Sequence, residues 1–304
     1  MGVEAKFRAV EQRIAESNGL DVQERWVDVA SPSVRVRVLE SGVGDPVLFI
    51  NGISAPGIGM APLAGRLPGH RLLLVDLPGH GLSPPYLWLD GPVRTQAVNI
   101  IAGVLDGLRI DQVTLVGCAL GGLFSLWFAL DRPSRVARVV LVGQPAGAIG
   151  DARADPYMGI FTAPVLGRVA TEMARLPMSR SAGRMGLRSA VGADGARSVS
   201  DDIIDLHLLS LRLPGQAASY RSLLRRLLVG RIPRPEVVLS DAELTSFTVP
   251  LLFVWPEDDR FLPPAAGKPS VDKIPTARFV TTPGGLFAWY DDPDRCAALV
   301  VEGL

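Results

Sequence analysis

The stretch LVGCALGGLFSLWFAL at residues 115–130 decides the fold of this chain. A short β-branched run at 113–116 leads into it, and an apolar segment of helical length follows. Gly117, Gly121 and Gly122 lie between the two, where the backbone has to turn tightly. The sequence therefore predicts a sharp strand-to-helix turn.

The pattern around this turn predicts a parallel sheet with helices on both faces. Segments of helical period, such as 93–108, alternate with short apolar runs, but from 150 to 246 helical stretches follow one another without strands. We expect a core at 1–149 and 247–304, and a helical lid at 150–246 that covers the carboxyl ends of the strands. The expected strands are 34–39, 46–50, 71–75, 113–116, 136–142, 249–255 and 277–281.

The composition is that of a globular protein with no net charge. Of the 304 residues 48% are hydrophobic, and 31 basic residues balance 31 acidic ones, so we expect neither nucleic acid nor a membrane as partner. Two cysteines are too few for a disulfide framework. The start does not read as a secretory signal, and no run reaches the roughly 20 apolar residues of a membrane span. A cytoplasmic location is the expectation.

Four further segments are arranged around the turn in an order that resembles the α/β-hydrolase family. The turn itself, Gly-Cys-Ala-Leu-Gly at 117–121, is similar to the family's G-x-S-x-G nucleophile elbow. The resemblance covers nearly the whole chain and implies an α/β-hydrolase fold of the lid-bearing branch that includes esterases and epoxide hydrolases. The other segments are VLFINGIS (47–54), similar to the oxyanion loop; LLLVDLPGHGLS (72–83), similar to D-x-P-G-x-G-x-S; VPLLFVWPEDDRFLPP (249–264), similar to the acid-bearing segment; and TTPGGLFAWYDDPD (281–294), similar to the Gly-Gly-His loop.

The resemblance implies a degenerate catalytic triad. The serine position falls on Ala119 and the histidine position on Leu286, while Asp259 keeps the acid position. Neither replacement has a hydroxyl or a titratable group, so no acyl-enzyme forms at Ala119. The oxyanion hole depends on backbone N–H groups alone, and these map to Ile53 and Leu120.

Asp259 has two interpretations. Burial without a cation would raise its pKa and make it a general acid or base near neutral pH. Alternatively, Arg260 or a loop amide holds it in a structural role. Other candidates for the pocket wall are Asn51, which replaces the family's histidine in the oxyanion loop, Cys118, expected to be a buried and inert thiol, Gln144, His207 and Trp289.

His207 lies on an expected lid helix, where it either reaches into the site or faces solvent beside Asp205. Gln144 ends a strand, where an amide either faces substrate or caps the backbone. Trp289 follows the late loop, where an aromatic ring more often fills the core.

These expectations favour a non-hydrolytic catalyst of the lyase, isomerase or cyclase type, acting on a small apolar carbonyl compound with the help of the backbone oxyanion hole. One alternative is a non-catalytic, ligand-binding pseudo-hydrolase. Another is a weak hydrolase of a reactive ester, lactone or epoxide, with water activated by Asp259 or His207.

Partner and cofactor expectations are brief. No metal-ligand cluster, phosphate-binding loop or nicotinamide fingerprint occurs, so we expect neither cofactor nor metal. The expected partner is a small apolar molecule. The lid is rich in leucine and arginine, which leaves a homodimer open.

Overall fold

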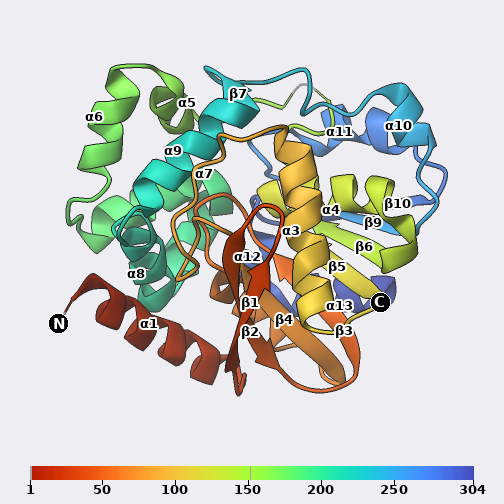
Figure 1. Cartoon of the computed structure of the whole chain (residues 1–304), viewed down its shortest axis with the longest axis horizontal. Helices are drawn as coiled ribbons and strands as arrows, with labels where there is room; N and C mark the ends of the chain where they lie inside the picture. Colours follow the sequence, from red (N-terminus) through yellow and green to blue (C-terminus); the bar gives the residue numbers. More distant parts are fainter. Residues whose placement is uncertain (1, 151) are drawn as a thin grey trace.

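An eight-stranded sheet runs through the middle of the protein (Figure 1). The structure is a computed structural model, and it describes residues 2–150 and 152–304. The strand order is β1-β2-β4-β3-β5-β6-β9-β10; β1–β2 and β2–β4 are antiparallel and the other neighbours are parallel. The bounds are β1 Gln23–Val29, β2 Val34–Ser41, β3 Asp45–Ile50, β4 His70–Asp76, β5 Val113–Gly117, β6 Val136–Val142, β9 Leu251–Pro256 and β10 Ala277–Thr282.

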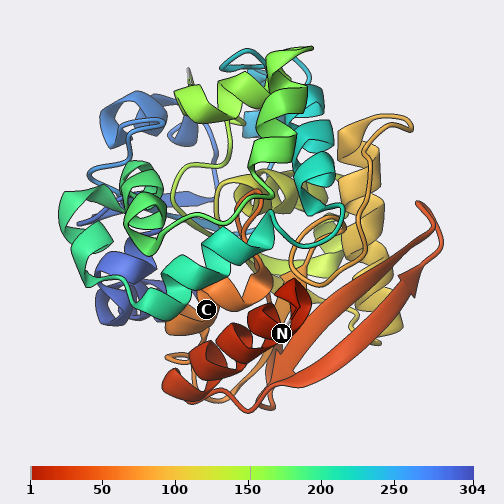
Figure 2. The same ribbon diagram turned by 90° about the vertical axis from the view of Figure 1, so that its left-hand side faces the viewer.

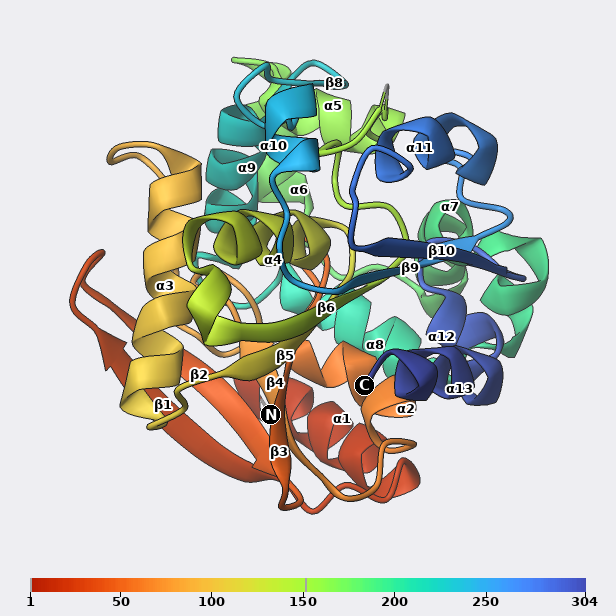
Figure 3. The same cartoon turned by 90° about the vertical axis from the view of Figure 1, so that its right-hand side faces the viewer.

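Helices cover both faces of the sheet (Figure 3). β6 and β9 consist almost entirely of buried apolar residues, as strands between two helical layers must. α3 (Val93–Gly107) and α4 (Leu120–Asp131) pack with one apolar cluster, and α1 (Val3–Ser17), α2 (Ala61–Ala64) and α13 (Pro293–Gly303) with another. The predicted α/β fold is confirmed. Shorter helices are η1 Gly57–Met60, η2 Pro133–Arg135, α10 Asp241–Thr245, α11 Pro264–Val271 and α12 Ala288–Asp291.

Helices fill the segment between β6 and β9. Side-chain caps explain where three of them begin: Asp155 accepts a hydrogen bond from the Tyr157 N–H, Ser179 from that of Ala182, and Ser200 from that of Ile203. In sequence order the segment contains α5 Pro156–Thr162, α6 Leu166–Met173, α7 Arg180–Ser198, α8 Asp201–Ser210, α9 Gln216–Leu227 and the two-stranded ribbon β7 Leu228–Val229 with β8 Ile232–Pro233.

The sequence analysis missed β1. This strand reads QERWVDV, and its first three residues are exposed at the edge of the sheet. Because β1 pairs only with β2, it needs few apolar side chains, and the apolar pattern of a buried strand is absent. Hydrogen bonding to β2, and not an apolar sequence pattern, defines this strand.

A buried ionic cluster joins α1 to the sheet. The Arg37 guanidinium on β2 is 2% exposed and pairs with Glu11 of α1 at 2.6 Å and with Asp76 at the end of β4 at 3.0 Å. The Asp76 carboxylate also accepts hydrogen bonds from the Gly57 and Leu82 N–H groups. Since each charge has hydrogen-bonding partners, the cluster fixes α1 in place.

Among the described helices, none combines the length and the apolar character needed to cross a membrane.

Candidate functional site

Ala119 occupies a strained backbone turn between β5 and α4. Its φ of 47° and ψ of −112° are unfavourable for any residue with a Cβ. The neighbouring glycines make the turn possible: a Cβ at Gly121 would lie 1.8 Å from the Ile50 carbonyl oxygen, and one at Gly117 would lie 2.7 Å from the Gly121 oxygen. The predicted sharp turn therefore exists, with a methyl group at its apex.

Two backbone N–H groups beside this turn have no acceptor among the described residues: those of Leu120 and Ile53. Leu120 is the first residue of α4, so the positive end of the helix dipole adds to its N–H. The next N–H, of Gly121, is already used by the carbonyl oxygens of Asn51 and Cys118. The two free donors can therefore hold a negatively charged oxygen.

A cavity of about 600 Å³ lies over these donors and separates the sheet loops from the helices of the inserted segment. Core residues supply its floor, and α5, α7, α8 and α9 supply the rest, with mostly apolar side chains. The floor includes Ile53, Ala119, Leu120, Leu286 and Phe287. An apolar substrate with one polarisable oxygen fits such a wall.

His207 of α8 is the histidine that lines this cavity among the described residues. Its ring stacks on Phe287 with the centroids 6.1 Å apart, and Nε2 is buried without a hydrogen-bond partner. The Phe287 ring in turn adjoins the turn, because a Cβ at Gly52 would lie 3.4 Å from that ring and 3.6 Å from the Ala119 Cβ. Burial lowers the pKa of His207 to about 4, so the ring is neutral at pH 7.

The Asp259 carboxylate is 2% exposed and lies outside the cavity wall. It accepts hydrogen bonds from the N–H groups of Phe261 (2.9 Å), Leu262 (3.2 Å) and Gln144 (3.2 Å). Burial raises its pKa to about 6, although the three hydrogen bonds oppose the shift. Loop amides thus hold the carboxylate, as the structural alternative expected, whereas no ion pair with Arg260 forms in the described part of the chain.

The structure separates the other sequence candidates. Gln144 lines the cavity, and its Oε1 accepts a hydrogen bond from the Gly147 N–H. Asn51, Cys118 and Trp289 are buried outside the wall. Asn51 bridges the Gly52 N–H and the Pro56 carbonyl, Cys118 contacts the Leu286 carbonyl at 3.7 Å, and the Trp289 indole donates to the Gly59 carbonyl. Burial raises the pKa of the Cys118 thiol, which keeps it protonated.

Sequence reasoning missed one aromatic residue of the site, Phe287, which forms a cluster with the neighbouring Tyr290. Phe287 supplies the ring on which His207 stacks, and Tyr290 meets the edge of the same imidazole. The Tyr290 hydroxyl is buried without a partner. The late loop that carries Leu286 also carries both residues, so the signal was their place in that loop. No three His, Cys, Asp or Glu side chains in the described ranges gather as metal ligands.

The fold is that of the α/β-hydrolase family. Residues 45–293 match the family model described as the alpha/beta hydrolase fold, and the chain belongs to that family. It is 29% identical over 253 residues to 2-hydroxy-6-oxononadienedioate/2-hydroxy-6-oxononatrienedioate hydrolase of Cupriavidus pinatubonensis, covering 80% of this chain and 81% of that one. The namesake from Burkholderia vietnamiensis is 26% identical, with 92% and 95% covered.

A solved structure shows the same fold. Carboxylesterase CesB of Bacillus subtilis superposes with a TM-score of 0.77 at 16% identity, covering 99% of this chain and 98% of that one. At this identity the likeness concerns the fold alone.

These relatives correct the functional expectation. A non-hydrolytic catalyst of the lyase, isomerase or cyclase type was expected, with a non-catalytic pseudo-hydrolase as one alternative and a weak hydrolase as the other. The relatives are named as hydrolases and point to hydrolysis. The expectation was wrong because it rested on the residue types at two positions, Ala119 and Leu286, whereas the relatives point to hydrolysis.

Proposed function

We propose that this protein is a hydrolase that cleaves a bond beside a carbonyl group in a small, mostly apolar oxo compound. The observation that carries the proposal is the cavity over the Ala119 turn, where the N–H groups of Leu120 and Ile53 lack acceptors in the described part of the chain. Membership of the hydrolase family and the names of the relatives support it. Those relatives act on oxo acids, which suggests the substrate class.

In this proposal, Ala119 and Leu286 stand at the family's serine and histidine positions, so water attacks the carbonyl carbon directly. The water proton passes to the neutral His207 ring, and the carbonyl oxygen, now an anion, accepts the Leu120 and Ile53 N–H groups. When the carbonyl re-forms, the bond to the leaving group breaks and that group takes the proton from His207. One water molecule is thereby divided between the two products.

The remaining parts of the protein support this chemistry. We propose that 150–246 act as a lid on the core of 1–149 and 247–304, and exclude bulk water from the cavity. The small apolar partner is then the substrate. Two free, buried cysteines suit a cytoplasmic location.

The first test compares the wild type, His207→Gln and His70→Gln on 2-hydroxy-6-oxo-2,4-heptadienoate and on p-nitrophenyl esters. Losing the proton acceptor should lower kcat by about 10²-fold or more. His70 lies on β4 outside the cavity wall, so its variant should keep full activity. Wild-type rates should fall on the acid side near pH 4 and not near the ordinary 6.5, since protonation at the lowered pKa removes the base. Equal activity of His207→Gln would contradict the mechanism.

The second test concerns the absent nucleophile. A serine-directed phosphonate should leave the wild-type mass unchanged, while Ala119→Ser combined with Leu286→His should gain the adduct. The single change Ala119→Ser is the control, because it supplies the hydroxyl without its base. An adduct on the wild type would show another nucleophile and overturn the water mechanism.

A further inference from the structure

The outer surface of the inserted helices is unusually apolar. Nine of the sixteen large hydrophobic side chains that are exposed in the described residues lie between positions 157 and 185. Exposed apolar surface concentrated in this way marks an interaction site. We call it the apolar lid face; it consists of Tyr157, Ile160, Val165, Leu166, Val169, Met173, Leu176, Met178 and Met185.

Helix α6 (Leu166–Met173) carries the centre of this face, and its apolar side faces solvent instead of the core. Leu166, Val169 and Met173 share one side at i, i+3 and i+7 and are 65%, 52% and 61% exposed. The small residues Gly167 and Thr171 are buried on the other side. A surface helix normally turns its apolar stripe toward the core, so this stripe is available to a partner.

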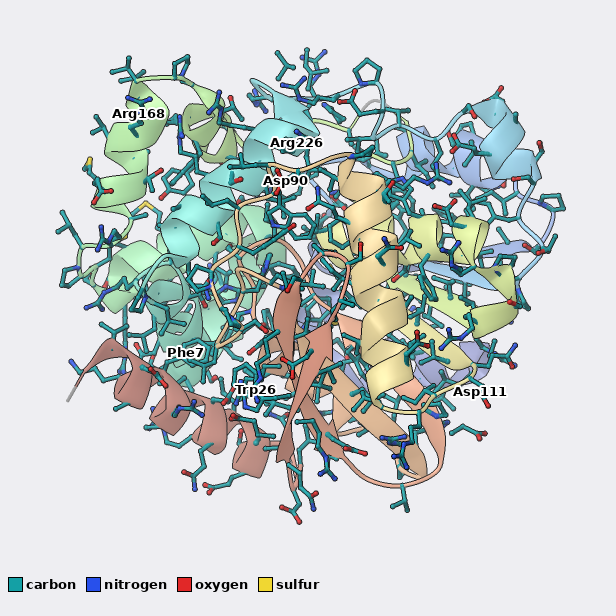
Figure 4. The ribbon with its side chains drawn as sticks, in the orientation of Figure 1. Phe7, Trp26, Asp90, Asp111, Arg168 and Arg226 are labelled. Carbon is teal, nitrogen blue, oxygen red and sulfur yellow. The ribbon has the colours of Figure 1, made fainter. Side chains whose placement is uncertain are left out.

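Arginines surround the apolar lid face. Helices α6 and α9 are in contact; α6 carries Arg168, and α9 carries Arg221 and Arg225. The Arg221 guanidinium donates hydrogen bonds to the carbonyl oxygens just before α6, and burial lowers its pKa, with the charges of Arg225 and Arg168 acting in the same direction. Neither Arg168 nor Arg225 has an ion pair in the described ranges. Figure 4 shows Arg168 on α6 and Arg226 on the adjacent α9, both at the outer surface. These arginines add positive charge beside the apolar lid face, although the net charge of the chain is zero.

The apolar lid face continues into the cavity. Tyr157, Met178 and Met185 are more than half exposed, and they also line the cavity over the Ala119 turn. These three side chains therefore belong both to the apolar lid face and to the wall of the cavity.

We propose that the apolar lid face, with Arg168, Arg221 and Arg225 beside it, docks this protein on a bilayer surface that contains anionic lipids. Apolar side chains enter the boundary of the acyl chains, while arginines pair with the headgroups. A twofold contact between two copies through this face would bring the same unpaired arginines together, which disfavours a dimer. The proposal goes beyond the hydrolase function and replaces the expectation of no membrane partner, because that expectation used the charge of the whole chain.

The test is co-sedimentation of the full chain with phosphatidylcholine vesicles, with and without phosphatidylglycerol. We expect binding to the anionic vesicles that weakens as salt is raised. Arg168→Gln with Arg225→Gln should bind about tenfold more weakly or worse, because each arginine near the surface adds to the attraction. Leu166→Ser with Val169→Ser should also weaken binding to the anionic vesicles. The binding that remains should still fall as salt is raised, because the arginines are unchanged.

Matched controls separate docking from general charge and hydrophobicity. Arg132→Gln with Arg278→Gln removes two exposed arginines on the core, and Val43→Ser with Val301→Ser removes two exposed valines there. Both should bind as the wild type does. Equal binding to neutral vesicles, no binding to either kind, or self-association that the lid-face variants abolish without vesicles would each overturn the proposal. None of these readouts depends on hydrolytic activity.

Discussion

At the residue scale, Ala119 occupies a strained strand-to-helix turn and has a methyl group as its side chain. Its φ of 47° puts the backbone in a conformation that is unfavourable for residues with a Cβ, so the folded state is strained at this position. The close approach of the backbone at Gly117 and Gly121 holds Ala119 in this conformation. The sequence predicted this turn because the glycine spacing is a local signal. The position of the turn also predicted the two backbone donors, the N–H groups of Leu120 and Ile53.

Ala119→Gly should raise the free energy of unfolding by about 1 kcal/mol, since glycine adopts this conformation without the Cβ penalty. Urea unfolding measures the change. Ala129→Gly is the matched control because it lies inside α4, where the same exchange should cost about 1 kcal/mol or more. If both variants lost stability alike, the turn would not be strained.

Other residues of the site could not be predicted from local signals. Stacking of His207 on Phe287 joins a lid helix to the late loop, 80 positions apart in the numbering. Its pKa of about 4 follows from burial that only the packed structure provides. The burial of Arg37, Glu11 and Asp76 could not be predicted either, because charged side chains are normally exposed.

At the element scale, α1 depends on its one buried acid. The Glu11 carboxylate meets the Arg37 guanidinium through two hydrogen bonds of 2.8 and 2.6 Å. By contrast, Glu4 on the same helix pairs with Arg8 at the surface. The predicted core strands were confirmed because apolar runs bounded by Gly or Pro carry their own signal, whereas β1 is defined by its partner β2.

Glu11→Ala should lower the free energy of unfolding by about 3 kcal/mol, because it leaves the Arg37 charge short of a buried partner. Thermal or urea unfolding checks this value. The control Glu4→Ala removes an exposed pair and should change stability by less than about 1 kcal/mol. Comparable effects of the two variants would mean that the cluster does not anchor α1.

At the scale of the whole molecule, the cavity exists only where the core loops and the inserted helices meet. The sequence predicted a helical insertion from the point at which strands cease, and its limits of 150 and 246 stay a prediction. It did not predict which helices line the cavity, since that depends on packing between segments far apart in the chain.

Gly186 on α7 lines the cavity, and a Cβ built there meets no atom within 4 Å. Gly186→Ala should stabilise the protein by about 0.5 to 1 kcal/mol through helix propensity alone. Gly186→Phe should keep the fold but narrow the cavity, so KM for the longest substrates should rise while short esters are unaffected. Unfolding and steady-state kinetics measure both. If Gly186→Phe left the KM values of long and short substrates unchanged, the substrate would not bind beside Gly186.

The contact between α1 and α8 matters for anyone choosing an expression fragment. In Figure 2 the first helix, in red, lies against the inserted helices, and Arg13 pairs with Asp202 at 2.7 Å at the start of the helix that carries His207. The family model matches only from residue 45, so a fragment trimmed to it would lose α1, β1 and β2. Such a fragment would retain every motif of the site and remove the support of its histidine-bearing helix.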